Sequence, residues 1–180
     1  MRFLARRGGV PADVLTRAGL QRGEKVLAHA ESRDGTWLLG TRQRLIVVGT
    51  TGTAIAWEGI EDAAWDQEAS RLRVTEIGRY GEQRPTHHFD MDDPTHLLQL
   101  VRERVTASVV LQRRVPVRGK LGLTVIGRRS PVGGAVTWMH AYDPGLAPAD
   151  PEVAAAAETA LVTAQSEVGE PADDTDSHPI

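Results

Sequence analysis

Three histidines and three aspartates lie within residues 86–96, which read THHFDMDDPTH. Neutral imidazole and carboxylate groups are ligands that zinc or manganese accepts, so this density could mark a metal site. A metal site of this kind needs three or four side chains that converge on one ion. The side chains that could form such a set are His88, Asp90, Asp92 and His96.

The same residues also fit the end of a strand followed by a capped helix. Alternate side chains of a strand face opposite ways, which separates His88 from the apolar Phe89 and Met91. Asp93 followed by Pro94 is typical of a helix start, because aspartate caps the helix and proline lacks only an N–H that would be unpaired there. We favour this interpretation, and metal binding is its alternative.

A basic segment, QRRVPVRGKLGLTVIGRRS at residues 112–130, contains no acidic residue. Arginine binds the phosphates of nucleic acid or of anionic lipid through charge-assisted hydrogen bonds. If the strands here are adjacent, one anion-binding stripe could form from Arg113, Arg114, Arg118, Lys120, Arg128 and Arg129. The alternative is a solvated outer face that the following acidic residues partly neutralise, since residues 143–180 hold nine acids and no base.

Sequence signatures of catalysis are missing. The chain has no cysteine and no serine in a G-x-S-x-G elbow. Residues 119–123, GKLGL, lack the spacing of a phosphate-binding loop, and G-x-G-x-x-G does not occur. We therefore expect a protein that is not an enzyme and that holds no cofactor.

Composition indicates an ordinary globular protein, with 41% apolar and 25% charged residues. The first residues have no apolar core of a signal peptide, and no run of eighteen apolar residues follows, so we expect a cytoplasmic protein without a transmembrane segment. Of the 21 basic residues, all but Lys25 and Lys120 are arginine, a bias typical of a bacterial genome rich in G and C.

Short stretches with period-two alternation predict seven strands after an N-terminal arm at residues 1–22. In the fifth, IEDAAWDQ, alternation places Ile60 and Ala64 on the inner face. The pattern then changes to a helical period, with Leu97, Leu98 and Val101 on one apolar stripe. Strands this short, without helices between them, favour an antiparallel meander that forms a barrel or sandwich. The expected strands are 25–32, 36–40, 44–49, 53–59, 60–67, 71–78 and 84–91.

Residues 113–168 predict a β-hairpin followed by a second helix. The stretches LGLTVIGRR and AVTWMHAYD flank the turn SPVGG, and VVLQRRVPV before them has the pattern of a further strand. Asp150-Pro151 repeats the capped helix start, and the helix that follows has a narrow face made largely of alanine. Residues 169–180 are acidic and poor in apolar side chains, which is typical of a disordered tail.

Seven strands followed by one amphipathic helix is the element order of a pleckstrin-homology-like (PH-like) domain. Residues 24–110 resemble the bacterial PH-like domains, and the longer chain resembles an uncharacterised family from high-G+C bacteria. The residues that carry the resemblance are GEKVLAHAESRDGTWLLGTRQRLIVVG at 23–49 and DDPTHLLQLVRERVTASVV at 92–110. It implies an α+β fold with a PH-like domain at residues 23–112.

The resemblance also implies a non-catalytic module that binds a protein partner. Peripheral binding to anionic lipid, or to nucleic acid, through residues 113–129 is the alternative function that the basic segment suggests. An acidic tail that masks the basic segment of the same chain is a further hypothesis.

Overall fold

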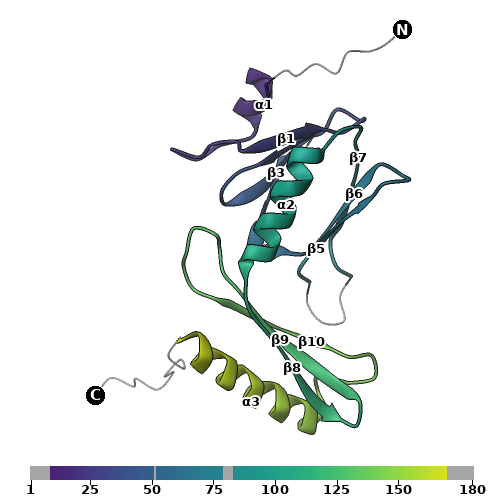
Figure 1. The fold of residues 1–180 in the computed structure, drawn as a ribbon, viewed down its shortest axis with the longest axis vertical. Coiled ribbons are helices and arrows are strands. Elements are labelled where there is room, and N and C mark those ends of the chain that lie inside the picture. The colour runs from purple at the N-terminus through teal and green to yellow at the C-terminus, as the bar shows by residue number, and fades with distance from the viewer. Residues whose placement is uncertain (1–8, 51, 79–82, 170–180) are drawn as a thin grey trace. The chain divides into compact units, whose positions relative to one another are not determined.

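The computed structural model describes residues 9–50, 52–78 and 83–169. It has a mixed α+β fold that contains three antiparallel sheets (Figure 1). The chain divides into two compact units, Met1–Ala107 and Ser108–Ile180, which we call unit 1 and unit 2.

Unit 1 contains two antiparallel sheets joined by a short 3-10 helix, η1. The first sheet has the order β1-β2-β3-β4 and the second has the order β5-β6-β7. The strands of the first sheet are β1 (Ala28–Glu31), β2 (Trp37–Gly40), β3 (Arg44–Val48) and β4 (Gly52–Ala56). They are followed by η1 (Trp57–Gly59), β5 (Ile60–Asp66), β6 (Arg71–Glu76) and β7 (Thr86–Asp90).

The turns between these strands follow from local side-chain chemistry. Between β1 and β2, the Asp34 carboxylate accepts a hydrogen bond of 2.9 Å from the backbone N–H of Thr36. Gly35 takes a φ of 84°, a left-handed conformation that glycine adopts without steric cost. Asp-Gly is a common pair in such hairpin turns, because both residues accept positive φ angles.

Helix α2 (Thr95–Ser108) closes the core of unit 1. Its Leu97, Leu100 and Val101 pack with residues of both sheets, including the fully buried Leu38 and Leu72. Gly40 in β2 lets the helix approach, because a Cβ there would lie only 2.5 Å from Cδ2 of Leu100. The two sheets therefore share one hydrophobic core, which α2 covers (Figure 1).

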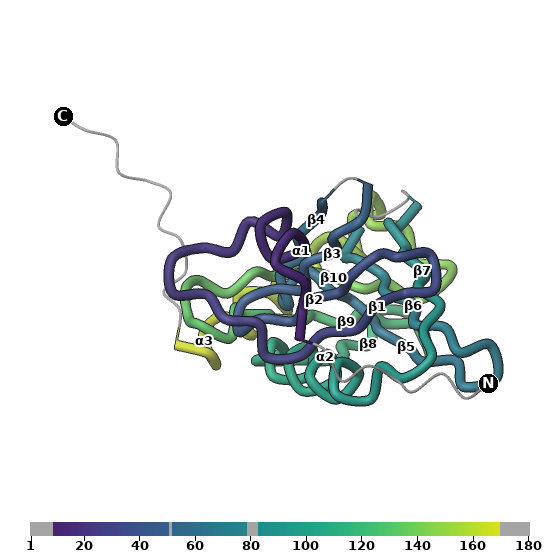
Figure 2. The backbone as a smooth tube through the Cα atoms, turned by 90° about the horizontal axis from the view of Figure 1, so that it is seen from above, coloured from purple at the N-terminus to yellow at the C-terminus, as the bar shows by residue number. Residues whose placement is uncertain are grey.

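The N-terminal helix α1 (Ala12–Arg17) covers the other face of the first sheet. Val14 and Ala18 are buried against Leu39, Ile46 and Val48, whose side chains point away from the main core. Figure 2 shows α1 lying over β2 and β3. Both faces of the central strands β2 and β3 are thus buried, which explains why WLLG and RLIVV are almost entirely apolar.

Unit 2 is a three-stranded sheet covered by one helix. Its strands have the order β10-β9-β8, and the elements are β8 (Val109–Arg118), β9 (Leu121–Arg128), β10 (Thr137–Tyr142) and α3 (Pro151–Val168). Asp150 caps α3 by accepting a hydrogen bond from the N–H of Glu152, and Gly169 ends it with a φ of 76°. Leu123 and Val125 of β9 are fully buried beneath α3.

The expected α+β class is confirmed, but the strands are arranged differently from a closed barrel. Within the described residues, β1–β7 form two separate sheets, since η1 interrupts the strand pairing between β4 and β5. In unit 2 the expected hairpin is present as β9 and β10, and β8 adds a third strand to it. Of the predicted acidic tail, residues 170–180 lie outside the described residues.

One predicted strand orientation is wrong. A β-bulge between Ile60 and Asp62 shifts the register, so the inner face of β5 carries Ala63 and Trp65 and not Ala64. A period-two pattern counted from Ile60 does not reveal a bulge, which adds one residue to the strand and reverses the faces of the residues after it.

None of the helices in the described part of the chain combines the length and the apolar character needed to cross a membrane.

Candidate functional site

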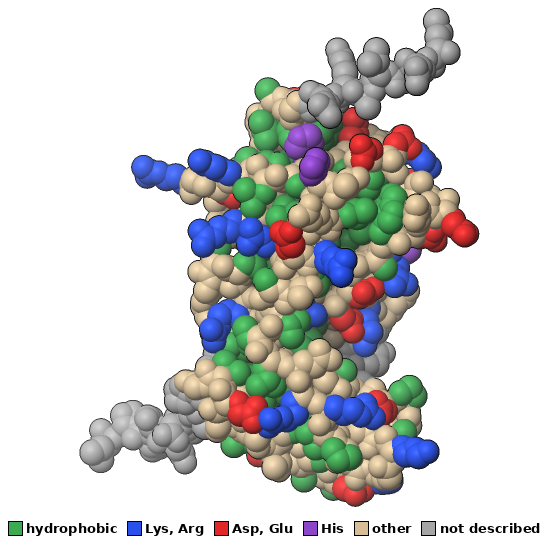
Figure 3. Space-filling view, in the orientation of Figure 1, with side chains coloured by type: hydrophobic (Ala, Val, Ile, Leu, Met, Phe, Trp, Pro, Cys, Tyr) green, Lys and Arg blue, Asp and Glu red, His purple; other side chains and the backbone are tan. Residues whose placement is uncertain are grey.

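A groove of about 480 Å³ lies in unit 1 between α2 and the β5–β6 hairpin. Figure 3 shows hydrophobic side chains gathered on the surface beside α2, where Figure 1 places this hairpin. The residues that line the groove are Ala63, Trp65, Leu72, Leu98, Gln99, Val101 and Arg102. Its floor is apolar, because Leu72 and Val101 belong to the buried core.

The two walls of the groove follow from the periods of a strand and a helix. On β5, Ala63 and Trp65 lie directly opposite Val74 and Leu72 of β6, so all four share the inner face of the sheet. On α2, Leu98 lies three positions before Val101 and is only half-buried, although it belongs to the same apolar stripe. The apolar stripe of α2 is therefore wider than the core that it covers, and Leu98 forms the second wall.

Strand β5 borders the groove with an open edge. In the order β5-β6-β7 it pairs with β6 alone, and no other described strand lies on its outer side. Alternate N–H and C=O groups of an edge strand point away from the sheet and can pair with another chain. The groove thus combines an apolar surface with a row of backbone donors and acceptors.

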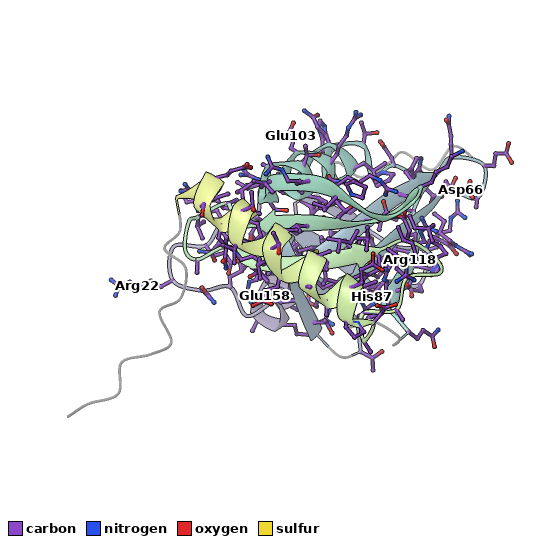
Figure 4. All side chains as sticks on the ribbon, turned by 90° about the horizontal axis from the view of Figure 1, so that it is seen from below. Arg22, Asp66, His87, Glu103, Arg118 and Glu158 are labelled. Atoms are coloured by element: carbon purple, nitrogen blue, oxygen red, sulfur yellow. The ribbon has the colours of Figure 1, made fainter. Side chains whose placement is uncertain are left out.

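Charged side chains cover the outer face of the same sheet. Arg73 pairs with Asp62 at 3.0 Å, and Arg71 pairs with Asp90 at 2.6 Å. The hydrogen bond from Arg71 holds the pKa of Asp90 below its usual range. A second hollow of about 390 Å³ on this side is lined by Ala64, Trp65, Asp66, Arg71, Arg73 and His88. Asp66, labelled in Figure 4, ends β5 and makes no ion pair with another described residue.

Polar side chains of α2 form the rim of the groove. Gln99 donates a hydrogen bond of 2.9 Å to Glu103, one helical turn later, and this bond orients both side chains. Arg102 is exposed and makes no ion pair within the part of the chain that the structure describes. Its guanidinium is the one charged group among the residues that line the groove.

The structure separates the four side chains that the sequence suggests as metal ligands. Asp90 pairs with Arg71, and Asp92 accepts from Arg33 at 2.7 Å. His88 lies on the outer face of β7, opposite Arg73, and His96 lies in the first turn of α2. Among residues 9–50, 52–78 and 83–169, no group of three or more histidine, aspartate or glutamate side chains could hold a metal ion.

At the junction between β7 and α2 a strand is followed by a helix, as the sequence predicts, but Pro94 precedes the first helical residue instead of being that residue. The Asp93 carboxylate accepts a hydrogen bond of 2.8 Å from the Thr95 hydroxyl, and α2 begins at Thr95. Phe89 and Met91 are buried in the core. His87 stacks on Phe89, and its Nε2 lies 2.6 Å from a carboxylate oxygen of Glu76.

Three arginines of the predicted anion-binding set form ion pairs inside unit 2. Arg113 contacts Glu167 of α3 at 2.5 Å, and Arg114 contacts Asp143 at 2.5 Å. Arg118 contacts Glu152, at the start of α3, and the capping Asp150. Hydrogen bonds from these arginines lower the pKa values of Asp143 and Asp150. Figure 4 shows Arg118 close to the first turn of α3.

The remaining three cations of that set occupy different surroundings. Arg128 is buried and donates a hydrogen bond of 3.0 Å to the Ser108 hydroxyl, Arg129 is half-buried, and Lys120 is exposed in the turn between β8 and β9. Along β8, the half-buried Arg113 and the exposed Arg114 lie on opposite faces. The structure therefore does not bring the six cations into one stripe, and anion binding by them stays a prediction.

The sequence patterns did not predict this groove. Two features of the sequence could have indicated it. Trp65 lies near the end of a strand, and Leu98 extends the apolar stripe of the helix beyond the residues that are buried in the core. Comparisons of the chain with protein-family models, with curated proteins and with solved structures found no match.

Proposed function

We propose that unit 1 is a PH-like interaction module that binds an extended segment of a protein partner in the groove between α2 and β5. The observation that carries this proposal is the position of an apolar groove directly beside the open edge of a strand. A segment that adds to β5 would satisfy its backbone through strand pairing and would place alternate side chains in the groove.

The order of elements supports the PH-like assignment. Four antiparallel strands, three further antiparallel strands and one helix follow one another along unit 1. The helix α2 packs on a core that both sheets share. Because fold by itself does not specify function, the groove and not this resemblance supports the proposed binding.

The chemistry of the groove favours binding over catalysis. Its lining contains one charged residue, Arg102, and no pair of titratable groups that could exchange a proton with a substrate. Burying one leucine-sized side chain contributes about 1.5–3 kcal/mol, and backbone pairing adds to this. A short segment held in this way would bind with modest affinity, as transient partners do.

Peptides displayed on phage and selected against the immobilised full chain would test the proposal. We expect enrichment of extended apolar segments, and we expect Leu98→Gln to weaken their binding by at least about tenfold, because it makes one wall polar. Val162→Gln, on exposed α3, is the matched control and should bind like the wild type. Equal binding by Leu98→Gln, with far-UV circular dichroism unchanged, would contradict the proposal.

Binding of anionic lipid or nucleic acid through residues 113–129 has weaker support. Arg113, Arg114 and Arg118 already have carboxylate partners, so an anion would have to displace Glu167, Asp143 or Glu152. Co-sedimentation with anionic vesicles, and its loss at high salt, would distinguish this activity from peptide binding.

A further inference from the structure

We propose that the segment bound at β5 carries basic residues that alternate with apolar ones, in the order basic, apolar, any residue, apolar, basic. This inference rests on the proposed function and specifies the chemistry of the partner. The pattern follows from the five residues of β5 between Asp62 and Asp66, since each residue of an added strand lies beside one of them.

The two apolar positions are set by the inner face of β5. Residues of the partner opposite Ala63 and Trp65 would point into the groove, toward Leu98 and Val101. A cation could not enter there favourably, because it would lose its hydration against an apolar floor and meet the positive charge of Arg102. Basic side chains of the partner must therefore point to the outer face.

The two basic positions are set by the charges on that outer face. On β6 this face carries Arg71 and Arg73, and on the neighbouring β5 it carries Asp62 and Asp66. Charges of opposite sign thus face each other across the strands, as cross-strand pairing favours. A new strand at the β5 edge would have Asp62 and Asp66 as its nearest charged neighbours. Basic residues on that strand would therefore continue the alternation of charge sign from one strand to the next.

Asp66 is the stronger of the two recognition groups. One of its carboxylate oxygens accepts a hydrogen bond of 2.9 Å from the N–H of Ala69, and Arg71, opposite on β6, attracts the group without forming an ion pair with it. Asp62 is shared with Arg73, and the side chains of that pair are 54% and 52% exposed, so water screens their attraction. Between them Ala64 has only a methyl group, which leaves room for any residue at the central position of the partner.

Three synthetic peptides would test the pattern, with the cores Lys-Leu-Thr-Leu-Lys, Gln-Leu-Thr-Leu-Gln and Glu-Leu-Thr-Leu-Glu. The pattern reads the same in both directions, so the test does not depend on whether the added strand is parallel or antiparallel. We expect fluorescence anisotropy with the full chain to give the strongest binding for the lysine peptide. At low salt the lysine and glutamate peptides should differ by about tenfold, and added salt should reduce the difference.

Variants of the full chain separate local recognition from the overall negative charge. Asp66→Asn keeps an acceptor for the Ala69 N–H and should remove most of the preference for lysine, and Asp66→Lys should reverse it. Glu158→Gln, which removes one exposed acidic charge from α3 (Figure 4), should leave the preference unchanged. If Glu158→Gln and Asp66→Asn lower the preference equally, the net charge attracts the peptide and the inference is wrong.

The outcomes also distinguish this inference from the proposed function. If all three peptides bind equally, and Leu98→Gln weakens all of them, the groove binds segments but does not select basic residues. If none of the peptides binds and display selects no apolar segment, the proposed function itself fails. A preference for the glutamate peptide would overturn the inference and leave the function intact.

Discussion

Glu24 precedes β1, and its carboxylate side chain is only 2% exposed. It accepts hydrogen bonds from Arg44 at 2.7 Å, from the Thr41 hydroxyl at 2.8 Å and from the Gln21 N–H at 2.9 Å. The hydrogen bond from Arg44 contributes most to lowering the pKa of Glu24 from 4.5 to about 2, against the opposing effect of burial. This residue ties the segment before β1 to β3.

Replacing Glu24 by glutamine should lower the free energy of unfolding by about 1–3 kcal/mol at neutral pH, because it leaves buried donors without a charged acceptor. The folded-state pKa is depressed, so the contribution of Glu24 is fully present above 4.5 and is lost as the pH falls toward about 2. Denaturant unfolding of both proteins across this range should show the difference shrinking. The exposed Glu68→Gln serves as the control; a difference that grows with acid would contradict this account.

Two tryptophans of unit 1 that look alike in the sequence have different roles. Trp57 is fully buried, and its indole N–H donates a hydrogen bond of 3.1 Å to the backbone carbonyl of Thr41. Trp65 is half-buried at the edge of the second sheet and lines the groove. Burial, and not residue type, decides which of them supports stability and which is available to a ligand.

We expect Trp57→Ala to reduce the free energy of unfolding by about 3–5 kcal/mol, as large core truncations do. Trp65→Ala should have a smaller effect on unfolding and should weaken peptide binding by about tenfold or more. Chemical denaturation and anisotropy on the same two variants would measure both properties. If Trp65→Ala unfolds as readily as Trp57→Ala, Trp65 belongs to the core and not to a binding surface.

At the scale of elements, α3 shows how small side chains set the distance between a helix and a sheet. Its buried residues are Val153, Ala157, Ala160 and Ala164, and the three alanines pack with Leu123 and Val125 of β9. Alanine lets the helix backbone lie close to the sheet, so the space for a larger side chain is missing. The ion pairs of α3 with Arg113 and Arg118 lie around this contact, are partly exposed and are screened by salt.

Packing should therefore matter more than charge in holding α3. Ala164→Leu should destabilise unit 2 by about 1–3 kcal/mol through overpacking, whereas the exposed Ala155→Leu should change its stability by less than about 0.5 kcal/mol. Thermal unfolding at low and high salt would compare these variants with Arg118→Ala. A larger loss for Arg118→Ala than for Ala164→Leu would show that the ion pairs dominate.

At the scale of the whole molecule, the two units have separate hydrophobic cores. The core of unit 1 combines the inner faces of β1–β7 with α2, and the core of unit 2 lies between β9 and α3. Leu38 and Leu123, which are both fully buried, belong to different clusters. We therefore expect each core to respond to a mutation by itself.

Hydrogen exchange on the full chain should reveal this separation. Leu38→Ala and Leu123→Ala should each cost about 2–5 kcal/mol within their own core. We expect Leu38→Ala to reduce protection mainly in residues 9–107 and Leu123→Ala mainly in residues 108–169. Equal loss of protection in both units for either variant would indicate one cooperative structure.

The sequence by itself predicted most of the elements, because their signals are local. Alternating apolar residues indicated the strands, and Asp150-Pro151 indicated the start of α3. Alternation also separated the cluster at residues 86–96, since it assigned Phe89 to the core and His88 to the opposite face of the strand. The α+β class follows from the order of these elements.

Only the tertiary structure decided which side chains meet, because such contacts depend on register and not on spacing along the chain. The bulge after Ile60 turned Trp65 toward the groove and Ala64 away from it. Arg118 contacts the carboxylates of Asp150 and Glu152, which lie 32 and 34 positions later in the sequence. The groove exists because Trp65 of β5 and Leu98 of α2, far apart in the sequence, line one surface beside an unpaired strand edge. Local periodicity indicates which way a residue faces only while the strand has no bulge, and the fold determines what the residue contacts.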